Sequence, residues 1–344
     1  MPEISVIVVN WNRRDLLRNC LRSLAQQQGV SFEVILVDNG SQDGSADMAR
    51  AEFGSGSQFP LRILRNPVNR GFCAANNQGI GAARGRYVAL LNNDAEAAPG
   101  WLAALRSAFD YGPDVGMAAS KILVKEEPGR IDKVGHLIYP DGQNRGRGSG
   151  EPDLGQYESV EEVLWPDGCA AMYCRHMLDQ IGGFDEDFFA YGDDAELGLR
   201  ARIAGWRCLY IPSAVVWHQR GATLGLSSAR RLQLIERNRV LLAVKLFPWT
   251  LLALNPFYFA ARLAVGAWAA VRDKGEVARY SGFSGKFRAA LAILWGDLTA
   301  VPLIPRMLHK RRQLRRIRKL SDSELRRLIL EHRIGLRQMM ELAA

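Results

Sequence analysis

The sequence predicts an α/β fold with an open, mostly parallel sheet flanked by helices, followed by a helical and basic C-terminal extension. Short apolar runs alternate four times with segments of helical spacing, the pattern of a parallel sheet with right-handed crossovers. Basic residues gather in the last third of the chain. With 344 residues and 48% hydrophobic composition, the chain can also bury a large core.

The first strand is predicted at residues 4–9, a continuous apolar run typical of a parallel strand buried on both faces. A helix follows at 14–27, where leucines and Cys20 recur on one helical face. Further apolar runs and helical patterns alternate along the chain. They predict strands at 32–37, 61–64 and 87–91, and helices at 45–53, 72–83 and 101–109.

The regular pattern loosens after residue 109. Residues 126–160 are rich in Gly, Pro and Asp, and they predict a long excursion or hairpin of a kind that is usually functional inside a compact domain. Regular structure resumes at 168–181. The remaining elements are a helix at 193–204 ended by Gly205 and a strand at 207–211, followed by Trp217 and His218.

Charge divides the chain into two parts. Residues 1–225 carry 22 Lys and Arg against 28 Asp and Glu, whereas residues 226–344 carry 23 against 8. The formal net charge of the whole chain is +9. We therefore predict two domains, residues 1–225 and residues 226–344, and an anionic partner for the second, either lipid or nucleic acid.

Residues 246–271 contain a single charge, Arg262, and several aromatic side chains of the kind found at membrane interfaces. A spanning helix needs about 20 uninterrupted apolar residues. Because Pro248 and Asn255-Pro256 interrupt this stretch, in-plane or re-entrant helices are predicted in place of a clean span. A buried helical subdomain is the alternative.

The most basic segment is residues 306–319, which hold eight Lys and Arg among Met, Leu and Ile at helical spacing. Nucleic-acid binding would need aromatic or polar side chains between the basic residues, so no nucleic-acid partner is expected. The pattern indicates a polybasic element at an anionic membrane surface, with a solvated helix pair packed on the first domain as the alternative. Ser321-x-x-Glu324 is a capping box that predicts the start of a last helix.

The five cysteines form no C-x-x-C pair, which predicts reduced thiols and neither a disulfide framework nor a zinc site. The N-terminus enters a strand without the basic and apolar regions of a secretion signal. Together with the basic C-terminal part, these features predict a cytoplasmic protein that is peripheral on the inner face of the cell membrane.

Polar residues gather in the loops that follow the predicted strands. The carboxyl ends of parallel strands meet at one edge of a doubly wound sheet, where ligands bind, so these residues should lie close together. A carboxylate there could accept hydrogen bonds from a base or ribose, or hold a divalent cation beside a diphosphate. The candidates are Asn10 and Asn12 after the first strand, Asp38 after the second, Asn69, Gly71 and Asn77 around the third helix, and Asn93 and Asp94 after the fourth strand.

Two later segments offer a second metal ligand and a base. A metal needs more than one ligand, and His218 is the obvious second one, although an isolated histidine is more often a satisfied polar residue at a strand end. Asp193 and Asp194 begin a predicted helix, where paired acids are commonly partners of the helix dipole. Here they follow the aromatic run 188–191, which would wall a pocket and favours Asp194 as a general base.

The ordered set of motifs resembles that of family 2 inverting glycosyltransferases with a GT-A fold, which include bacterial rhamnosyltransferases of cell-surface polysaccharide assembly. The resemblance covers about residues 4–225. Each motif is weak alone, but their order along the chain is specific. The motifs are Val37-Asp38-Asn39-Gly40-Ser41, Asn69-x-Gly71-Phe72 with Asn77-x-Gly79, Asn92-Asn93-Asp94, Gly182-Gly183-Phe184-Asp185-Glu186-x-Phe188-Phe189 with Gly192-Asp193-Asp194, and Trp217-His218.

The resemblance implies a role for each candidate residue. Asp38 would bind the base, and Asp194 would be the catalytic base. Asp94 and His218 would hold Mg²⁺ or Mn²⁺. Asn92 stands where the family has the first Asp of its D-x-D motif, which leaves Asp94 as the only carboxylate there. The other residues implied in nucleotide-sugar binding are Asn10, Asn12, Asn69, Gly71, Asn77 and Asn93.

The activity that the resemblance implies is metal-dependent transfer of a sugar from a nucleoside diphosphate donor to a glycan or lipid-linked acceptor in cell-envelope polysaccharide synthesis. Rhamnose is the first guess for the sugar. A nicotinamide-dependent oxidoreductase is excluded, because residues 79–84 fail the last position of G-x-G-x-x-G and do not follow the first strand. A non-catalytic membrane-docking protein with a transferase fold is the alternative, and the presence of all the candidate carboxylates together with His218 argues against it.

Overall fold

The computed structural model describes residues 1–54, 56, 58–220, 228–272, 280, 282–335 and 338. The chain forms two compact units. The first comprises Met1–Gly135 and Gly146–Arg220, and the second comprises His136–Arg145 and Gly221–Ala344. The domain boundary predicted at residue 225 lies outside the described residues and stays a prediction.

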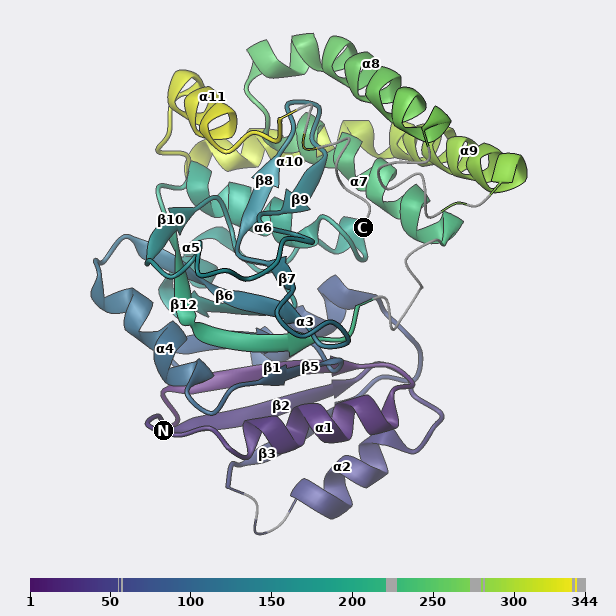
Figure 1. Ribbon diagram of the computed structural model, residues 1–344. Helices are drawn as coiled ribbons and strands as arrows, with labels where there is room; N and C mark the ends of the chain where they lie inside the picture. Colours follow the sequence, from purple (N-terminus) through teal and green to yellow (C-terminus); the bar gives the residue numbers. More distant parts are fainter. Residues whose placement is uncertain are drawn as a thin grey trace. The chain divides into compact units, whose positions relative to one another are not determined.

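The first unit is built on a sheet that has 10 strands in the described residues (Figure 1). The alternation of strands and helices predicted for its first half is confirmed. The elements in chain order are β1 (Ile4–Asn10), α1 (Arg14–Leu24), β2 (Phe32–Asp38), α2 (Ser45–Phe53), β3 (Leu61–Arg65), α3 (Phe72–Ala82), β4 (Tyr87–Leu91), β5 (Ala95–Ala97), α4 (Trp101–Ser107), β6 (Val115–Val124), β7 (Ile131–Lys133), β10 (Glu161–Val163), β11 (Ala170–Cys174), α5 (Arg175–Ile181), α6 (Asp193–Ile203) and β12 (Arg207–His218).

The apolar periods of the sequence account for these elements. Every residue of β2 is buried, as expected for a strand covered on both faces. α1 buries Leu17, Leu21 and Leu24 on one face, as its helical spacing predicted. Helices cover both faces of the sheet, with α1 and α2 on the near side of Figure 1 and α3 on the far side. Gly205 ends the segment after α6 with a φ of 85°, a conformation that favours glycine.

The strand order is β10-β12-β6-β11-β4-β1-β2-β3. β1, β2, β3 and β4 pair in parallel, and β6 and β12 run in the same direction because β11 pairs antiparallel with both β4 and β6. The chain builds outward from β1 to β3 and then returns to place β4 on the other side of β1. The order of strands therefore reverses between β1 and β4, which is where ligands bind in doubly wound sheets.

The strand predicted at 207–211 is longer in the structure and runs to His218. Its register against β6 shifts between Ile211 and Val215, so that Pro212 lies in an irregularity of the ladder. Proline lacks an N–H to donate, and a bulge lets the strand continue past it. Trp217 and His218 are therefore the last two residues of β12. The sequence had placed them after the strand.

The second unit is mainly helical and includes the hairpin that the sequence predicted within 126–160. The capping box at Ser321 and Glu324 is confirmed. The elements are β8 (His136–Ile138), which pairs with β9 (Asn144–Gly146), and the helices α7 (Ala229–Leu246), α8 (Trp249–Val271), α9 (Gly282–Ala300), α10 (Ile304–Gln313) and α11 (Asp322–Glu331).

The break predicted at Pro256 is wrong, because α8 continues through it as one helix. A proline inside a helix removes one backbone hydrogen bond and strains the preceding turn. Here the neighbouring Asn255 is held from the side, since its Nδ2 donates to the carbonyl oxygen of Asp141 at 2.9 Å. Pro248, the other predicted interruption, lies just before α8 as its N-cap residue.

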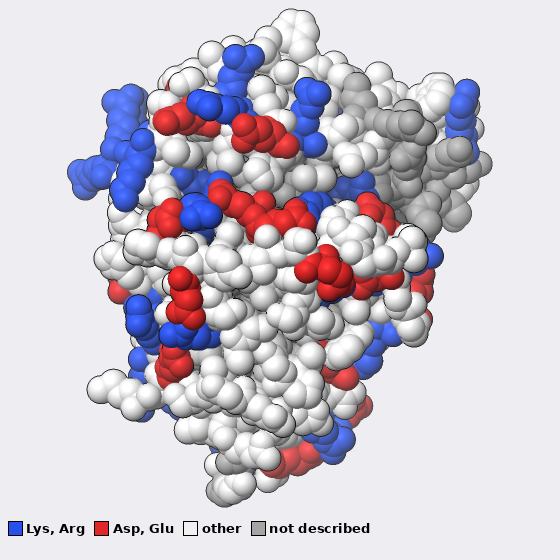
Figure 2. All heavy atoms as spheres, turned by 60° about the vertical axis from the view of Figure 1, so that its left-hand side comes forward, with Lys and Arg blue, Asp and Glu red and all other residues white. Residues whose placement is uncertain are grey.

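Charges of both signs are interspersed on the face shown in Figure 2. Ion pairs of the first unit show the same mixture, for example Arg106 with Glu3 and Arg207 with Glu162 at 2.9 and 2.8 Å. Exposed pairs of this kind contribute little to stability. Residues 226–344, in contrast, are strongly basic in composition.

Candidate active site

The polar residues predicted from the sequence gather at one edge of the sheet. β1, β2, β4 and β12 run in the same direction, so their carboxyl ends lie on the same side. Asn10 and Asp38 are register partners at the ends of β1 and β2. Asn93, just after β4, donates from Nδ2 to Oδ1 of Asn10 at 2.6 Å. The structure thus brings three of the predicted segments together where the strand order reverses.

Ser41 ties together the loops that follow β1 and β2. Its Oγ accepts hydrogen bonds from Asn10 Nδ2 at 3.2 Å and from Asn12 N at 3.0 Å. Asn12 Oδ1 in turn accepts from Gln42 N at 2.7 Å. Asn12 has a φ of 50°, a left-handed conformation that Asn tolerates better than most residues. Asn10 and Asn12 therefore shape this loop, and their contact with a nucleotide stays a prediction.

Asp38 has a buried carboxylate oxygen without a partner. The residue is 5% exposed, and its Oδ1 accepts no hydrogen bond from any described residue. An unsatisfied buried acceptor costs about 1–3 kcal/mol. An N–H or O–H group of a ligand would remove that cost, which fits the predicted role of Asp38 in binding a base or ribose.

Side-chain amides organise the loop at residues 66–71. Asn39 Oδ1 accepts from Asn66 Nδ2 at 3.0 Å and from Arg70 N at 3.1 Å. Asn39 Nδ2 donates to Asn69 Oδ1 at 2.9 Å, and that oxygen also accepts from Gly71 N at 2.9 Å. Asn69, predicted as a ligand residue, is thus also the centre of the loop that leads into α3.

Gly71 and Asn77 lie against the segment that leads to α6. Gly71 has a φ of 85°, and a Cβ there would meet the Phe189 ring at 2.5 Å, so only glycine fits. The Phe72 N–H donates to the Phe189 carbonyl at 2.8 Å. Asn77 Nδ2 donates to the Phe184 carbonyl, and its Oδ1 accepts from Phe184 N, at 2.9 and 2.8 Å. Both residues position this segment, and their predicted contact with a nucleotide sugar is not tested by these contacts.

Asp193 and Asp194 form an adjacent acidic pair at the start of α6. Burial and the neighbouring charge of Asp194 raise the pKa of Asp193 well above its usual range. The raised pKa favours the protonated form of Asp193. Asp194 Oδ1 accepts from Ala195 N at 2.7 Å, and Oδ2 lies 3.4 Å from the N–H of Gly168. This arrangement is suited to a general base.

Arg200 fixes the turn between α5 and the segment with Phe184 and Phe189. It pairs with Glu196 through two hydrogen bonds of 2.9 and 2.8 Å. It also donates to the carbonyls of Ile181, Gly182 and Gly183. Glu196 is fully buried and Arg200 nearly so, so each needs the other to compensate its charge.

Replacing Arg200 by Met is expected to lower the free energy of unfolding by about 3–5 kcal/mol, since Glu196 would lose the guanidinium that compensates its buried charge. The double variant Glu196→Leu/Arg200→Met should lose less, because it leaves no unpaired charge. Urea denaturation of the two variants measures the difference. Equal losses in both would show that the carbonyl contacts, and not the ion pair, carry the stability.

His218 ends β12 beside Asp94. Its Nε2 lies 3.4 Å from Asp94 Oδ1, a buried oxygen that accepts no hydrogen bond from the described residues. Its Nδ1 lies 2.8 Å from Oδ2 of Asp132. If Nδ1 carries the proton that is donated to Asp132, the lone pair of Nε2 and Asp94 Oδ1 face the same space. A carboxylate behind a histidine is a common support of a metal ligand.

Neighbouring charges keep Asp132 ionised. Burial would raise its pKa, but Lys133 and His218 hold it at about 2. Burial would likewise lower the pKa of His218, whereas its neighbours Cys169, Asp132 and Asp94 raise it well above the usual value, so that binding of a cation at Nε2 would displace a proton from that nitrogen. Lys133 pairs with Asp167 at 2.7 Å and so extends the network. The support behind His218 is therefore a charged, connected group of residues.

Asp94 and His218 fit a divalent cation. A carboxylate oxygen with an imidazole nitrogen suits Mn²⁺ better than Mg²⁺, which takes oxygen ligands. The buried, unpartnered Asp94 Oδ1 is the observation that favours such a ligand. Asn92 supplies no second carboxylate. Further ligands would have to come from water or substrate.

Comparison with known families identifies the chain. The profile of glycosyl transferase family 2 matches residues 5–182. The chain belongs to glycosyl transferase family 2. The matched residues include β1 to β4 and the ends of these strands, at which Asn10, Asp38 and Asp94 lie, and they stop before Asp194 and His218.

Two relatives and one solved structure illustrate the similarity of this glycosyltransferase to known proteins. N-acetylglucosaminyl-diphospho-decaprenol L-rhamnosyltransferase of Mycobacterium tuberculosis is 27% identical over 259 residues, 67% of this chain and 80% of that protein. Uncharacterized protein y4gI of Sinorhizobium fredii is 30% identical over 241 residues, 65% of this chain. The match spans only 25% of that longer protein.

The solved structure is mannosyltransferase PcManGT from Pyrobaculum calidifontis in complex with GDP-Man and Mn²⁺. It is 20% identical, with a TM-score of 0.52 over 92% of this chain and 86% of that one. At this identity the likeness concerns the fold alone. It confirms the predicted GT-A type of α/β fold for the glycosyltransferase.

Asp132, the residue that supports His218, is not among the residues predicted from the sequence. Asp132 lies in β7, within the Gly- and Pro-rich region that was predicted only as an excursion. Its pairing with His218 spans 86 residues of sequence, and no motif spacing links the two. The one sequence feature that could have indicated Asp132 is its place as a carboxylate within a long loop region of a catalytic domain.

Proposed function

We propose that this glycosyltransferase is an inverting enzyme that moves a sugar, with rhamnose as the first candidate, from a nucleoside diphosphate donor to a glycan or lipid-linked acceptor in cell-envelope polysaccharide synthesis. The observation that carries the proposal is the set of carboxylates at one sheet edge. Asp38 offers an unpartnered acceptor, Asp94 lies beside His218, and Asp194 adjoins Asp193, whose pKa is raised by its burial and by Asp194. The rhamnosyltransferase relative supports the choice of sugar.

In the proposed reaction the acceptor oxygen attacks C1 of the sugar from the side opposite the diphosphate. Asp194 takes the proton of the acceptor hydroxyl as the new C1–O bond forms. The bond from C1 to the diphosphate oxygen breaks, and the diphosphate leaves with the electron pair. A divalent cation bound by Asp94 and His218 would supply charge neutralisation for the departing diphosphate. Asp38 and the loop of Asn10 and Asn12 would hold the nucleoside.

We further propose that the protein acts at the cytoplasmic face of the cell membrane. The similarity to an enzyme named for a decaprenol-linked substrate supports an acceptor of that class. The basic residues 306–319 would bind anionic lipid there, where each Lys or Arg near the surface contributes about 1 kcal/mol.

A panel of nucleoside diphosphate sugars tests the proposed function. The protein with Mn²⁺ is expected to hydrolyse one donor slowly, with a deoxythymidine diphosphate rhamnose sample as the first candidate, and to gain thermal stability from that donor. Release of free nucleoside diphosphate measures the reaction. No hydrolysis and no thermal shift with any donor would refute the proposal and favour a non-catalytic protein that keeps the fold.

A further inference from the structure

Helix α8 of the second unit turns its only charged side chain inward. Of its 23 residues, Arg262 alone is charged, and that side chain is 14% exposed. Arg262 Nε donates to Oδ2 of Asp141 at 2.6 Å, and its two terminal nitrogens donate to Glu236 at 2.8 and 2.7 Å. A charged residue normally lies on the solvent-facing side of a helix, but here it pairs with buried carboxylates.

Helix α9 likewise turns its one acidic residue inward, whereas its Arg288 is exposed. Its acidic residue Asp297 accepts a hydrogen bond from Arg239 Nη2 at 2.6 Å, and Arg239 also donates from Nε to Glu236 at 2.8 Å. Arg239 and Glu236 are both nearly fully buried. α9 lies close to α7, since a Cβ on Gly296 would meet the carbonyl oxygen of Gln233 at 2.6 Å. One buried ionic network therefore joins α7, α8 and α9.

The outward face of α8 is apolar, and that of α9 is apolar apart from Arg288 near its start. On α8 the exposed residues recur at helical spacing and include no charge, and Phe257 is 74% exposed. On α9, Trp295 is 58% exposed. Further large exposed side chains include Leu254, Leu263 and Trp268 on α8, and Leu291, Leu294 and Leu298 on α9. Soluble proteins rarely expose contiguous apolar patches of this kind without a partner.

Two helical stretches have the length and composition of membrane helices. Within the described residues, these are α8 (Trp249–Val271) and Ser284–Arg316, which contains most of α9 together with α10. Only 6% of the apolar window of the first and 22% of that of the second are buried, so neither is the core helix of a soluble domain.

We propose that the outward faces of α8 and α9 insert, parallel to the membrane plane, into the headgroup and outer acyl region of a bilayer that contains anionic lipid. This inference deepens the membrane localisation proposed above and rests on it. An in-plane position places Leu, Phe and Trp side chains in the apolar boundary layer and keeps the network of Arg262, Glu236 and Arg239 on the protein side. A spanning α8 would carry that network to the middle of the hydrocarbon, where charges are costly.

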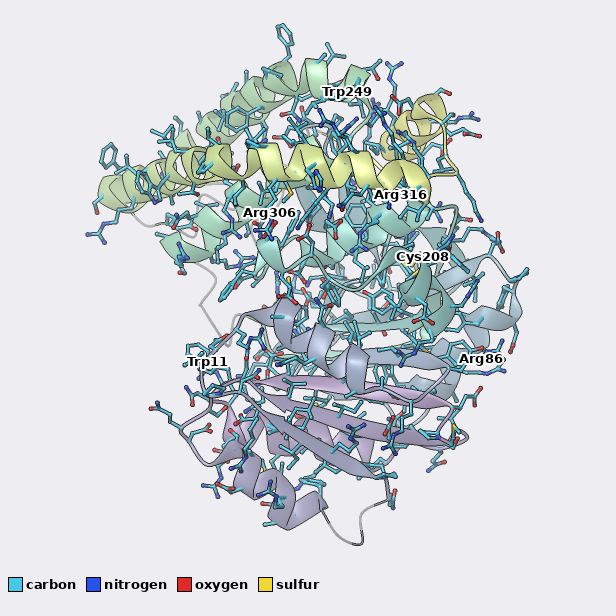
Figure 3. The ribbon with its side chains drawn as sticks, turned by 180° about the vertical axis from the view of Figure 1, so that it is seen from behind. Trp11, Arg86, Cys208, Trp249, Arg306 and Arg316 are labelled. Atoms are coloured by element: carbon cyan, nitrogen blue, oxygen red, sulfur yellow. The ribbon has the colours of Figure 1, made fainter. Side chains whose placement is uncertain are left out.

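Charge complementarity favours anionic lipid as the occupant. From residue 282 to residue 319 the only acidic residue is Asp297, which is paired with Arg239. The same stretch has Arg306, Arg312 and Arg316 among its exposed residues. Figure 3 shows Arg306 and Arg316 along one helical segment, with Trp249 at the start of α8.

The basic segment is also physically linked to α8. The guanidinium of Arg311 lies 4.2 Å from the centre of the Trp249 ring, a cation–π contact between α10 and α8. The apolar face and the basic residues thus belong to one unit with internal contacts. Together they have the composition of an interfacial element that binds anionic membranes, with Trp and Phe on one side and Lys or Arg beside them.

Vesicle flotation of the whole protein tests the apolar part. The variant Phe257→Gln/Trp268→Gln/Leu291→Gln/Trp295→Gln should bind phosphatidylglycerol-containing vesicles at least about tenfold more weakly, and the loss should persist at about 1 M NaCl, where charge attraction is screened. The matched control Tyr111→Gln/Leu154→Gln removes exposed apolar side chains from the first unit and should bind like the unaltered protein. Unchanged binding of the fourfold variant would overturn the proposal.

A second variant separates the electrostatic part. Arg312→Gln/Arg315→Gln/Arg316→Gln/Lys319→Gln should lose the preference for phosphatidylglycerol over phosphatidylcholine and keep the salt-resistant binding. Loss of all binding in this variant would show that the basic residues alone hold the protein and would overturn the insertion.

Quenching by brominated lipids measures the depth. Bromines near the headgroup should quench tryptophan fluorescence more than bromines at the acyl midpoint, and Trp268→Phe/Trp295→Phe should remove most of this quenching while flotation persists. Stronger quenching from the midpoint would indicate a spanning helix. A lipid-free dimer that the fourfold variant dissociates would indicate a protein interface. Either result contradicts in-plane insertion.

Donor hydrolysis without vesicles distinguishes this inference from the proposed function. The fourfold variant should hydrolyse the donor at the rate of the unaltered protein, because its substitutions lie outside the sheet-edge site. Flotation that persists in a protein without any donor hydrolysis would refute the enzyme activity and leave the membrane surface standing. Donor hydrolysis by an unaltered protein that does not float with vesicles would refute the membrane surface and leave the enzyme activity standing.

Discussion

Replacing Asp194 by Asn is expected to reduce sugar transfer by about 10²–10⁴-fold and to leave donor binding intact, because the substitution removes the general base and keeps the shape of the side chain. The pKa of Asp193 is raised by its burial and by Asp194, which disfavours a second negative charge on the pair and fits the assignment of Asp194 as the base. Single-turnover transfer and thermal stabilisation by the donor measure the two effects separately. Loss of donor binding together with activity would contradict the assignment of Asp194 as a base.

Asp193→Asn is the matched control, since it makes the same substitution in the other acid of the pair and leaves the proposed base in place, so it should retain most of the activity. It also has a distinct effect on stability. The pKa of Asp193 in the folded protein lies above its unfolded value, so its contribution is fully present below about pH 4 and is lost as the pH rises toward the folded pKa. The variant should therefore gain stability relative to the unaltered protein as the pH rises. A constant difference across pH would show that Asp193 is ionised in the folded protein.

Local patterns in the sequence were sufficient for the first half of the sheet. β1 and β2 are apolar runs that are buried on both faces, and α1 has its leucines on one face, so pattern and structure agree. The capping box at Ser321 could be predicted because its reciprocal bonds are made within four residues. The polar ends of these strands could be placed at one edge because parallel strands share a direction.

Long-range pairing is the part that local patterns could not supply. β11 lies antiparallel between β4 and β6. The residues of β11 alone do not indicate which strands it pairs with. β12 passes Pro212 by means of a register shift, which depends on the neighbouring strand β6. Similarly, α8 continues through Pro256 with support from contacts outside the helix. In each case a tertiary contact overrides the local signal.

The candidate site divides in the same way. Asp38, Asp94 and Asp194 could be proposed because each lies next to a recognisable strand end or helix start. Asp132 could not, because β7 joins the edge of β6 only in the folded sheet and so places this carboxylate behind His218. A supporting residue has no motif of its own, since its position is defined by the residue that it supports.

The strongest test of the metal site compares Asp94→Ala with Asp132→Asn. Asp94→Ala removes a proposed ligand, so Mn²⁺ binding and the dependence of activity on Mn²⁺ should both be lost. Asp132→Asn leaves the ligands in place and removes the charge that orients His218, so Mn²⁺ affinity should fall about 10–100-fold and activity should recover at high Mn²⁺. Electron paramagnetic resonance of free Mn²⁺, with a nucleoside diphosphate present, measures the affinity independently of turnover.

The matched control for Asp132→Asn is Glu162→Gln. Glu162 is a carboxylate that pairs with another residue of β12, Arg207, at 2.8 Å. Arg207 begins β12, whereas His218 ends it. Replacing Glu162 should leave Mn²⁺ affinity unchanged. An effect seen only with Asp132→Asn then depends on the position of Asp132, and not merely on the loss of a carboxylate next to β12. Unchanged affinity in both Asp94→Ala and Asp132→Asn would show that the cation is not bound at this edge. A loss with Asp94→Ala alone would mean that Asp94 binds metal without the support of Asp132, because His218 would then be oriented by the strand itself.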